Sequence, residues 1–588
     1  MITYKAPLQD YQFILSELLA EDLAQTGQQG FALEDYMAII EEAAKLCEAE
    51  LLPINRQGDE QGCSFDGERV KTPEGFKAAF DQFAQGGWIG LNADAEFGGM
   101  QLPLFLNVIL HEMIMASCFS FGDYVGLPQA AMKTIAAHGS EEIKQRFLPR
   151  MVSGEWSATM CMTEPQCGTD LGLISASAEP IGEDGYRLNG TKIFISGGDH
   201  DLSENIVHLV LARLPDAPEG VRGLSLFLCP KFNLNDDGEI TGRNGVNVVR
   251  LEKKMGYRAA STCEMFFENA EAQLLGEPHK GLKAMFTMVN TARLLVALQG
   301  LGSSETGYQT ALAYARERRQ GRALSGVVDV DKSADLLLVH PDVRRMLLAT
   351  RSFTDAGRAL ALWLAMQMEQ AQHHSQADKR QRAADLVALL TPVVKASFTD
   401  LGFESCNNAM QIFGGHGYIR DNGLEQLVRD CRIAQIQEGA NSIQALDLIG
   451  RKLNMHDGRL WNAFSEEVKA TTSEAASSPA VSHFAIALKD AFYALQSATE
   501  DLNRRIAKDA NEIGAAGVDY QKAFALVTFG WMWLKIAQVC ATRTDEFSQS
   551  KCAVARYFFA RELPKVKLHL QVAATGADVL MSVDEALF

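Results

Sequence analysis

Residues 186–198 read YRLNGTKIFISGG, and this stretch decides the fold class. Its β-branched and aromatic residues are broken by Asn and Gly, the pattern expected of strands that end in turns. Similar short runs follow, separated by Gly, Asn, Asp and Pro, at residues 206–211, 224–228, 246–251 and 265–267. Together they predict a small antiparallel barrel or sandwich in the middle of the chain.

Helical spacing lies on both sides of this β-rich region. Apolar residues recur at three- and four-residue steps, as on the buried stripe of a helix, at Tyr36, Ile39, Ile40, Ala43, Ala44, Cys47 and Leu51. The spacing returns at Gly281. We therefore predict a mainly α protein with a central β domain. The expected parts are an N-terminal extension (1–34), an N-terminal helical domain (35–155), the middle β domain (156–276), a four-helix-bundle domain (277–455) and an extra C-terminal helical domain (456–588).

Composition narrows the class of protein. A chain of 588 residues is too long for one hydrophobic core, and its net charge of -19 argues against nucleic acid as a partner. The eleven cysteines include no CxxC pair, which predicts reduced thiols and neither disulfides nor a metal site. No signal peptide and no apolar run of roughly 18 residues is apparent. We expect a cytoplasmic location, with peripheral attachment to the inner membrane as an alternative.

The segment 429–444, RDCRIAQIQEGANSIQ, carries the strongest candidate for a catalytic group. Glu438 is followed by a glycine, so the main chain can come close to a ligand while the carboxylate projects toward it. The alternative is an ordinary solvated charge at a turn.

Two segments of the β-rich region offer hydrogen-bond donors to a polar, planar ligand. In 163–170, TEPQCGTD, two hydroxyls flank a glycine, although a turn with a Thr cap would look the same. In 191–198, TKIFISGG, Phe194 and Ser196 are expected on one face of a strand, either as ligand contacts or as a core Phe above a turn.

Two segments of the later helical region could hold phosphates. The glycines of 411–418, QIFGGHGY, let main chain approach a phosphate, but no strand precedes them as in a Rossmann or Walker motif. His416 has no second ligand nearby, so no metal is expected. In 314–322, YARERRQGR, the arginines either complement a helix C-terminus or form a guanidinium fork for a pyrophosphate.

Taken in this order, the segments resemble the acyl-CoA dehydrogenase family over about residues 35–455. The opening 4–8 and the long helical tail look like its larger subgroup, which includes 3-methylmercaptopropionyl-CoA dehydrogenases and bacterial long-chain enzymes. The resemblance implies an FAD enzyme that converts an acyl-CoA thioester to a trans-2-enoyl-CoA and passes electrons to an electron-transferring flavoprotein. It also implies a homodimer or a dimer of dimers.

The resemblance assigns a role to each residue. Glu438 matches the base that takes the α-proton, while flavin N5 accepts the hydride. The cofactor-binding positions are Met162, Thr163, Gly168, Thr169, Phe194, Ser196, Arg318, Gln411, Gly414 and Gly415. The substrate-binding positions are Thr169, Arg293 and Gly439.

The sequence departs from the family pattern at three places. Gln437 stands where Tyr is common, Ala440 where Thr is common, and Gly321-Arg322 where Phe-Gly usually follows the arginine segment. Two alternatives therefore stay open. An acyl-CoA oxidase that uses oxygen remains possible because the sequence carries no signal for the electron acceptor. A catalytically idle acyl-CoA-binding protein remains possible because the neighbours of the base are altered.

Overall fold

A computed structural model describes residues 2–26, 30–182, 185–235 and 237–588. The chain forms two compact units. The first consists of Met1–Ala44, Leu104–Ala116 and Val296–Phe588, and the second consists of Lys45–Pro103 and Ser117–Leu295. The division falls within the long helix α9 (Gly281–Glu317). The predicted fold class is confirmed: the chain is mainly helical, with one larger sheet and an extra set of C-terminal helices.

The second unit is built around a seven-stranded sheet in the order β10-β11-β5-β4-β6-β3, and β7 pairs with both β11 and β6. Its strands are β3 (Trp156–Cys161), β4 (Ser177–Ile181), β5 (Gly185–Ser196), β6 (Asn205–Arg213), β7 (Leu224–Pro230), β10 (Val246–Leu251) and β11 (Thr262–Leu275). Smaller hairpins pair β1 (Ser64–Phe65) with β2 (Val70–Lys71) and β8 (Phe232–Leu234) with β9 (Ile240–Arg243). Because β7 bridges two non-adjacent strands, the sheet curls around an apolar core that includes Leu188, Phe227 and Phe267.

Two details of the sheet differ from the sequence prediction. The sheet is not wholly antiparallel, because β3 pairs with β6 in parallel, with Trp156 opposite Asn205. The runs 186–188 and 192–195 belong to one strand, which passes through Gly190. A Cβ at Gly190 would lie 2.8 Å from the Ala176 Cβ, so the glycine allows the close approach that lets the strand continue.

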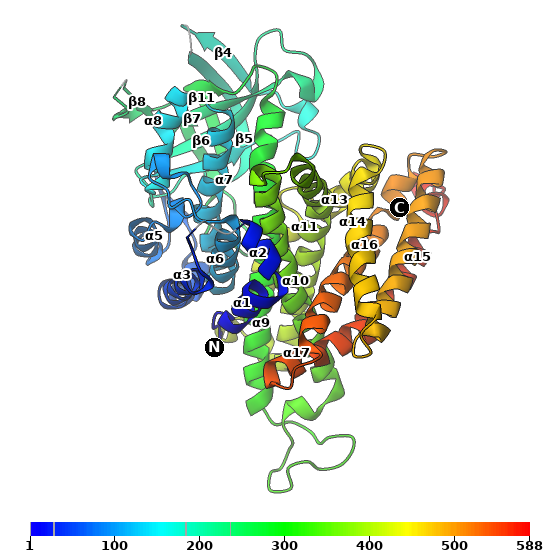
Figure 1. Ribbon diagram of the computed structural model, residues 1–588. Helices are drawn as coiled ribbons and strands as arrows, with labels where there is room; N and C mark the ends of the chain where they lie inside the picture. The colour runs from blue at the N-terminus through cyan, green and yellow to red at the C-terminus, as the bar shows by residue number, and fades with distance from the viewer. Residues whose placement is uncertain (1, 27–29, 183–184, 236) are drawn as a thin grey trace. The chain divides into compact units, whose positions relative to one another are not determined.

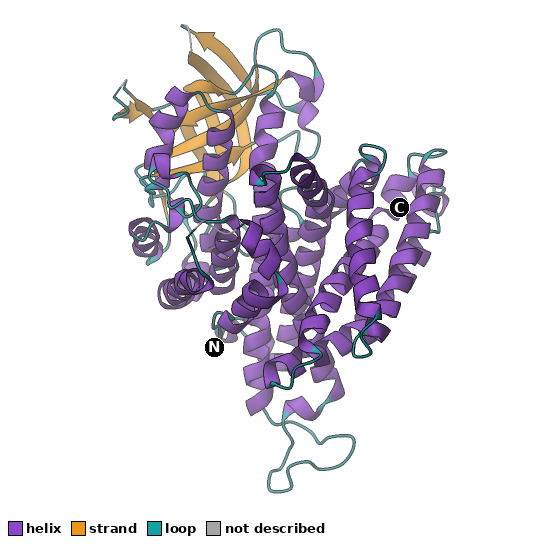
Figure 2. Cartoon of the chain, viewed as in Figure 1, coloured by secondary structure: helices purple, strands orange, loops and turns teal. Residues whose placement is uncertain are grey.

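Helices α7 and α8 of the second unit pack against β3, and Figure 2 shows the sheet, in orange, at one end of the helices. The helices of the second unit are α4 (Leu52–Gln61), α5 (Phe76–Gln85), α7 (Gly122–His138), α8 (Glu141–Val152) and the first part of α9. Ser140 is the N-cap of α8, since its hydroxyl accepts a hydrogen bond from the main-chain N–H of Ile143 at 3.2 Å.

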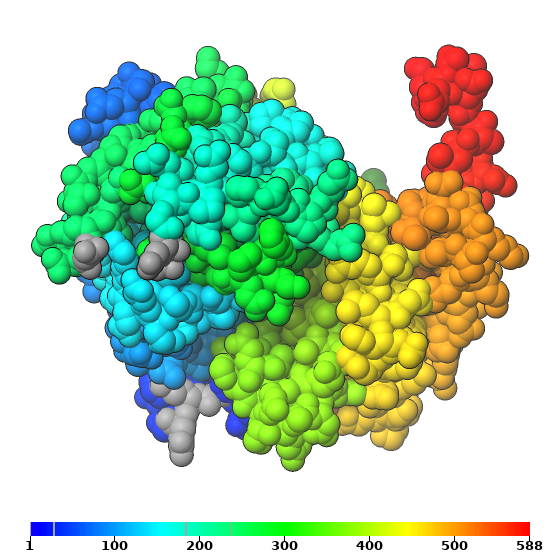
Figure 3. All heavy atoms as spheres, turned by 90° about the horizontal axis from the view of Figure 1, so that it is seen from above, coloured from blue at the N-terminus to red at the C-terminus, as the bar shows by residue number. Residues whose placement is uncertain are grey.

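The first unit is helical throughout its described residues. It contains α1 (Leu8–Phe13), α2 (Ala20–Thr26), most of α3 (Leu33–Leu46) and α6 (Leu104–Ser117), the second part of α9, α10 (Pro341–His373), α11 (Ala377–Phe413), α12 (Leu424–Cys431) and α13 (Asn441–Gly450). The C-terminal helices are α14 (Arg459–Ala476), α15 (Ser482–Ile506), α16 (Glu512–Cys540), α17 (Glu546–Tyr557), α18 (Lys565–Ala573) and α19 (Asp578–Met581). In Figure 1, α14, α15 and α16 run side by side. Figure 3 shows the last residues, in red, projecting beyond these helices.

Aromatic packing joins α16 to α10, and a buried cluster of charges joins α10 to α6 and α9. Trp531 of α16 packs edge-on against Trp363 of α10, with ring centroids 5.0 Å apart. Arg358 of α10 is buried and donates to Glu112 of α6 at 2.8 Å and to Glu305 of α9 at 2.7 Å. Removing one member of this cluster would destabilise the fold, because a charge that stays buried without its counter-charge is strongly unfavourable.

Three helices are long and apolar enough to cross a membrane by length and composition, contrary to the sequence expectation. They are α9, the segment Ala377–Tyr418 that contains α11, and α16, and 78%, 61% and 78% of their most apolar windows are buried inside the protein. Most of this apolar surface therefore packs against other parts of the chain.

Candidate functional site

The turn that carries Glu438 has an unusual main-chain conformation. It lies between a 3-10 turn (Arg432–Gln435) and α13, and its φ angles are 54° at Glu438 and 86° at Gly439. A non-glycine residue in the left-handed region costs on the order of 1–3 kcal/mol and persists only where its surroundings enforce it. The half-buried Glu438 side chain is therefore aimed by the fold rather than by local preference.

Two side chains hold this turn by its carbonyl groups. Lys395 of α11 is fully buried, and its Nζ donates to the Gly439 carbonyl at 2.9 Å and to Asn441 Oδ1 at 3.0 Å. Gln444 of α13 donates through Nε2 to the carbonyls of Glu438 at 3.2 Å and Gly439 at 3.0 Å. Because both donors are buried and are fixed on helices α11 and α13, the strained turn has a rigid support.

The two departures beside the base are accommodated in different ways. Gln437 donates through Nε2 to Gln299 Oε1 of α9 at 2.7 Å, so this position is anchored by an amide pair. Ala440 precedes the first residue of α13 and makes no side-chain cap. The loss of the usual hydroxyl at Ala440 leaves the turn supported by Lys395 and Gln444.

In the second unit, Met162, Thr163, Phe194 and Ser196 lie at the ends of β3 and β5. The Thr163 carbonyl accepts from the main-chain N–H of Ile193 at 2.9 Å, which ties the two segments together. Phe194 has a φ of 59° and is 61% exposed, so it is not the core Phe of the alternative interpretation. An exposed ring held in a strained conformation is typical of a ligand contact.

A buried ion pair between Glu164 and Lys192 stabilises the ends of β3 and β5. Glu164 accepts from Lys192 Nζ at 2.7 Å and from the main-chain N–H groups of Ser175 at 2.8 Å and Ala176 at 3.0 Å. Burial alone would raise the pKa of Glu164, but the Lys192 ammonium and these hydrogen bonds outweigh it and lower that pKa. Lys192 also donates to the Met162 carbonyl at 3.1 Å, so the pair fixes the residues just before Glu164.

The surface beside Ser196 has the features that a polar, planar ligand requires. Ser261 is buried, and its main-chain N–H donates to the Tyr124 hydroxyl at 2.8 Å. The Ser261 carbonyl accepts from the main-chain N–H of Gly197 at 2.8 Å, which places this residue next to the Ser196 turn. Gly168 and Thr169 are exposed, and a Cβ at Gly168 would meet only Thr163 Cγ2 at 4.0 Å. Main chain there can approach a ligand closely.

The first unit brings together the two segments that were candidates for phosphate binding. Tyr314 of α9 stacks on Phe413 with centroids 3.9 Å apart and hydrogen-bonds through its hydroxyl with His416 Nδ1 at 2.8 Å. This contact joins the end of α9, just before Arg318, to the turn after α11. The predicted positions on these segments, Arg318, Gln411, Gly414 and Gly415, are all exposed, and a Cβ at either glycine would meet nothing within 4 Å.

The departure at Gly321-Arg322 belongs to an ordered loop. Arg322 Nη1 donates to the Asp329 carbonyl at 2.9 Å and reaches Asp335 Oδ1 at 3.3 Å. Asp335 accepts from the main-chain N–H groups of Ala323 at 3.0 Å and Asp329 at 2.8 Å. These main-chain donors lower the pKa of Asp335 to about 2. Arg322 therefore organises its own loop instead of replacing the family's adenine contact.

Several contributors were not identified from the sequence. Lys395 and Gln299 lie far from Glu438 in the chain. Gln444 lies close to it but belongs to no recognisable motif. Arg293, in the first part of α9, is half-buried and belongs to the second unit.

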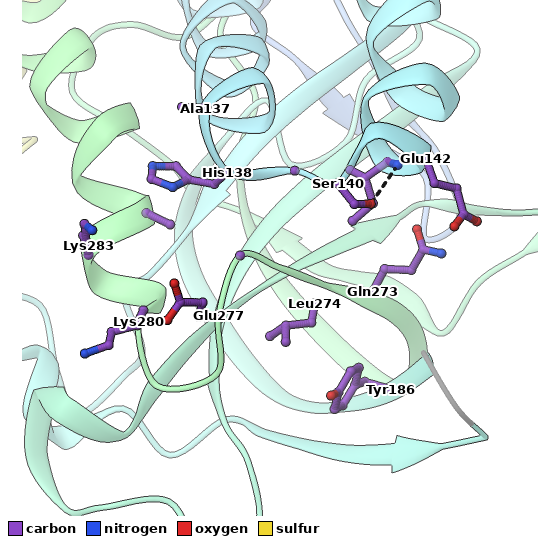
Figure 4. Close-up of a pocket in the computed structure, with 14 residues that line it drawn as sticks. Ala137, His138, Ser140, Glu142, Tyr186, Gln273, Leu274, Glu277, Lys280 and Lys283 are labelled. Carbon is purple, nitrogen blue, oxygen red and sulfur yellow. Dashed lines mark hydrogen bonds between the residues drawn. The ribbon is translucent and has the colours of Figure 1, made fainter.

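A cleft of about 820 Å³ lies elsewhere in the second unit, between the α7–α8 turn, the start of α9 and the ends of β5 and β11. Figure 4 shows Lys280, Lys283 and Glu277 on its α9 side and Gln273 and Glu142 across from them. None of the predicted site residues lines it.

Comparisons with known proteins cover nearly the whole chain. The sequence matches family descriptions of acyl-CoA dehydrogenase N-terminal (34–155), middle (159–270) and C-terminal (279–453) domains, and of an acetyl-CoA dehydrogenase C-terminal-like domain (464–584). It is 38% identical to 3-methylmercaptopropionyl-CoA dehydrogenase of Ruegeria pomeroyi over 98% of this chain and 99% of that protein. It is 30% identical to a broad-specificity linear acyl-CoA dehydrogenase of Mycobacterium tuberculosis over the full length of both.

Solved structures show the same fold. An acyl-CoA dehydrogenase from Bacillus anthracis complexed with FAD matches with a TM-score of 0.75 and 19% identity, over 100% of this chain and 94% of the other. A chain from the structure of the electron transferring flavoprotein of Acidaminococcus fermentans matches with a TM-score of 0.59 and 26% identity, over 73% of this chain and 100% of the other.

Proposed function

The chain belongs to the acyl-CoA dehydrogenase family, and we propose that it oxidises an acyl-CoA thioester to a trans-2-enoyl-CoA with Glu438 as the base. The observation that carries this proposal is the Glu438 turn, whose left-handed conformation is held by Lys395 and Gln444. A base must be fixed within hydrogen-bonding reach of the proton it takes, and a rigid strained turn supplies that fixation.

The neighbouring helix also suits a carboxylate base. Helix α13 begins at Asn441, three residues after Glu438. The positive end of a helix favours a nearby negative charge, which helps to keep a carboxylate ionised and able to accept a proton. The main-chain N–H of Glu438 would donate to the thioester carbonyl, as in the family, and so make the α-proton more acidic.

FAD is the cofactor of this family, and the residues present fit it. Thr163 and Ser196 offer hydroxyls to the edge of the flavin ring, Phe194 offers an exposed aromatic face, and Met162 and Gly168 supply main chain nearby. Arg318, Gln411, Gly414 and Gly415 form an exposed surface suited to a dinucleotide phosphate and adenine. When bound, FAD accepts the substrate's β-hydrogen as hydride at N5.

Similarity to the Ruegeria protein over almost the full length supports 3-methylmercaptopropionyl-CoA as a substrate, beside fatty-acyl-CoA. Thr169, Arg293 and Gly439 are the proposed contacts to the thioester and its CoA chain. The Gln437–Gln299 pair and the Lys395 anchor favour a working enzyme over an idle acyl-CoA-binding protein.

We further propose an electron-transferring flavoprotein as the electron acceptor and a homodimer or dimer of dimers in the cytoplasm. The likeness to a chain in an electron transferring flavoprotein structure supports the first proposal. The exposed Arg318 surface supports the second, because in the family it serves the cofactor of the partner subunit.

The test is anaerobic titration of the purified holoenzyme with saturated acyl-CoAs of increasing length and with 3-methylmercaptopropionyl-CoA, following flavin bleaching. Glu438→Gln should bind these thioesters but lose reduction by about 10³-fold or more, the upper range for loss of a general base. Glu404→Gln, an exposed acid of α11, is the matched control and should behave as wild type. Unchanged bleaching in Glu438→Gln would refute the mechanism, and stoichiometric peroxide in air would make the protein an oxidase.

A further inference from the structure

Asp400 of α11 joins the two ends of the turn that carries Glu438. One of its oxygens, Oδ1, accepts from Gln435 Nε2 and from Asn441 Nδ2, each at 2.7 Å. Gln435 lies three residues before Glu438, at the end of the 3-10 turn, and Asn441 lies three residues after it, at the start of α13. The Asp400 carboxylate therefore closes a ring of contacts around the proposed base.

Further contacts fix Asn441 against the same face of α11. Its Oδ1 accepts from Lys395 Nζ at 3.0 Å, and its Nδ2 also donates to Thr399 Oγ1 at 3.0 Å. Residues 395 and 399 are four positions apart, so they lie one above the other on a helix, and Asp400 follows directly. Because α11 is 37 residues long, these partners have fixed positions relative to one another.

The turn needs such a restraint because its main chain is strained. The φ angles of Glu438 and Gly439 are 54° and 86°, and a non-glycine residue keeps such a conformation only where its surroundings enforce it. Lys395 and Gln444 hold the carbonyls at the centre of the turn. Asp400 holds the segments on either side, so it keeps the two ends of the turn at a fixed separation.

A carboxylate is well suited to this task. Each carboxylate oxygen has two lone pairs, so a single oxygen can accept from two donors at once. Both distances, 2.7 Å, lie at the short end of the range for N–H···O hydrogen bonds. Hydrogen bonds to a carboxylate are roughly twice as strong as those between neutral groups. Asp400 is also half-buried, so the bridge is partly shielded from water.

We propose that Asp400 is a positioning residue for removal of the α-proton: it bridges Gln435 and Asn441 and thereby holds the Glu438 carboxylate in its working direction. The inference rests on the proposed function, because Glu438 is the base only within it. Asp400 itself touches neither substrate nor cofactor. Without the bridge the turn relaxes, so fewer molecules have a correctly aimed base, while binding of the thioester is little affected.

The first experiment measures the limiting rate of flavin reduction by a saturated acyl-CoA in the holoenzyme. Asp400→Leu should lower this rate about 10- to 100-fold, the effect of one or two hydrogen bonds at about tenfold each. The acyl-CoA concentration that gives half the limiting rate should change by no more than about twofold. Asp378→Leu, the same substitution at an exposed position of α11, should leave the rate within about twofold of wild type. A loss below tenfold in folded Asp400→Leu would overturn the proposal.

The conservative variant tests the chemistry of the bridge. Asp400→Asn keeps a carbonyl oxygen that can accept from the same two donors, although without the charge. Its rate should therefore recover to within about fivefold of wild type. An Asp400→Asn enzyme as slow as Asp400→Leu would contradict the bridge.

The second experiment asks whether Asp400 acts through the base. The double variant Glu438→Gln/Asp400→Leu should be no more than about threefold slower than Glu438→Gln, because a base that has been removed cannot be aimed. A general loss of structure would slow the reaction in both backgrounds. A larger further loss in the double variant would thus show that Asp400 does not act through Glu438.

These results separate the inference from the proposed function. If Glu438→Gln reduces flavin at the wild-type rate, the proposed function fails and the inference fails with it. If Glu438→Gln is inactive but Asp400→Leu works as wild type, the inference alone fails. If Asp400→Leu does not fold, Gln435→Leu takes its place, because it removes one of the two hydrogen bonds to Asp400. Its rate should fall about tenfold, and a loss below threefold would overturn the proposal.

Discussion

Replacing Lys395 by Met should uncouple the catalytic turn from the bundle. The Lys395 ammonium makes two hydrogen bonds to the turn, at 2.9 Å to Gly439 and 3.0 Å to Asn441. Hydrogen bonds from charged groups contribute about 1.5–3 kcal/mol each, so two would contribute roughly 3–6 kcal/mol. Gln444 also donates to the Gly439 carbonyl, at 3.0 Å, so part of the support remains and the lower end of that range applies.

A loss of about 3 kcal/mol is comparable with the strain stored at Glu438, which is on the order of 1–3 kcal/mol. The turn would then relax in most molecules, and the population with a correctly aimed carboxylate would fall. We expect kcat to drop about 100-fold, the equivalent of about 2.7 kcal/mol, with KM little changed. Stopped-flow flavin reduction by acyl-CoA measures this loss without interference from the electron acceptor.

Lys551→Met is the matched control, because Lys551 is also buried in the first unit but pairs with Asp355 at 3.0 Å, away from the turn. It should lower the unfolding temperature and leave kcat within about twofold. If Lys395→Met does not fold, Gln444→Leu removes the remaining side-chain donor to the Gly439 carbonyl and should lower kcat about tenfold. A folded Lys395→Met enzyme with kcat within threefold of wild type would refute the account of the turn.

Three further changes test the supports of the fold. Lys192→Met should lower the free energy of unfolding by about 3–5 kcal/mol in urea titrations, because it leaves the buried Glu164 carboxylate without its counter-charge. Since its partner lowers the Glu164 pKa, that deficit should be full above pH ~4.3 and shrink below it, so a pH-independent deficit would contradict the pairing. Arg358→Leu should lower the free energy of unfolding by a similar ~3–5 kcal/mol. Arg382→Leu, which removes a partly exposed ion pair, should lower it by about 1 kcal/mol or less. Equal losses in the two variants would be inconsistent with burial as the cause. Asp335→Asn should speed limited proteolysis of the 318–335 loop. In the wild-type protein, resistance of this loop to proteolysis should be full above pH ~3.9 and should fall as the pH drops toward 2, because the folded state lowers the pKa of Asp335. Equal cleavage rates of variant and wild type would exclude Asp335 as the residue that orders the loop.

Local patterns in the sequence were sufficient for element types and for the main base. Helical and strand periodicity depend on which faces are buried, so they predicted a central β region between helical regions. Glu438 could be nominated because a glycine follows it, and that glycine does adopt a positive φ. The family resemblance carried the remaining site residues.

Pairing and support were decided by tertiary structure. No local pattern encodes that β3 lies parallel to β6, whose matching residues are about fifty positions later, because a strand's periodicity is the same in either direction. Lys395 was likewise invisible as a site residue, since a buried charge gains its role from acceptors on elements far away in the chain. The sequence alone determined which residues could form helices, strands and a base. Only the folded chain determined which distant side chains hold that base in a conformation it would not otherwise adopt, because that free energy comes from contacts between separate elements.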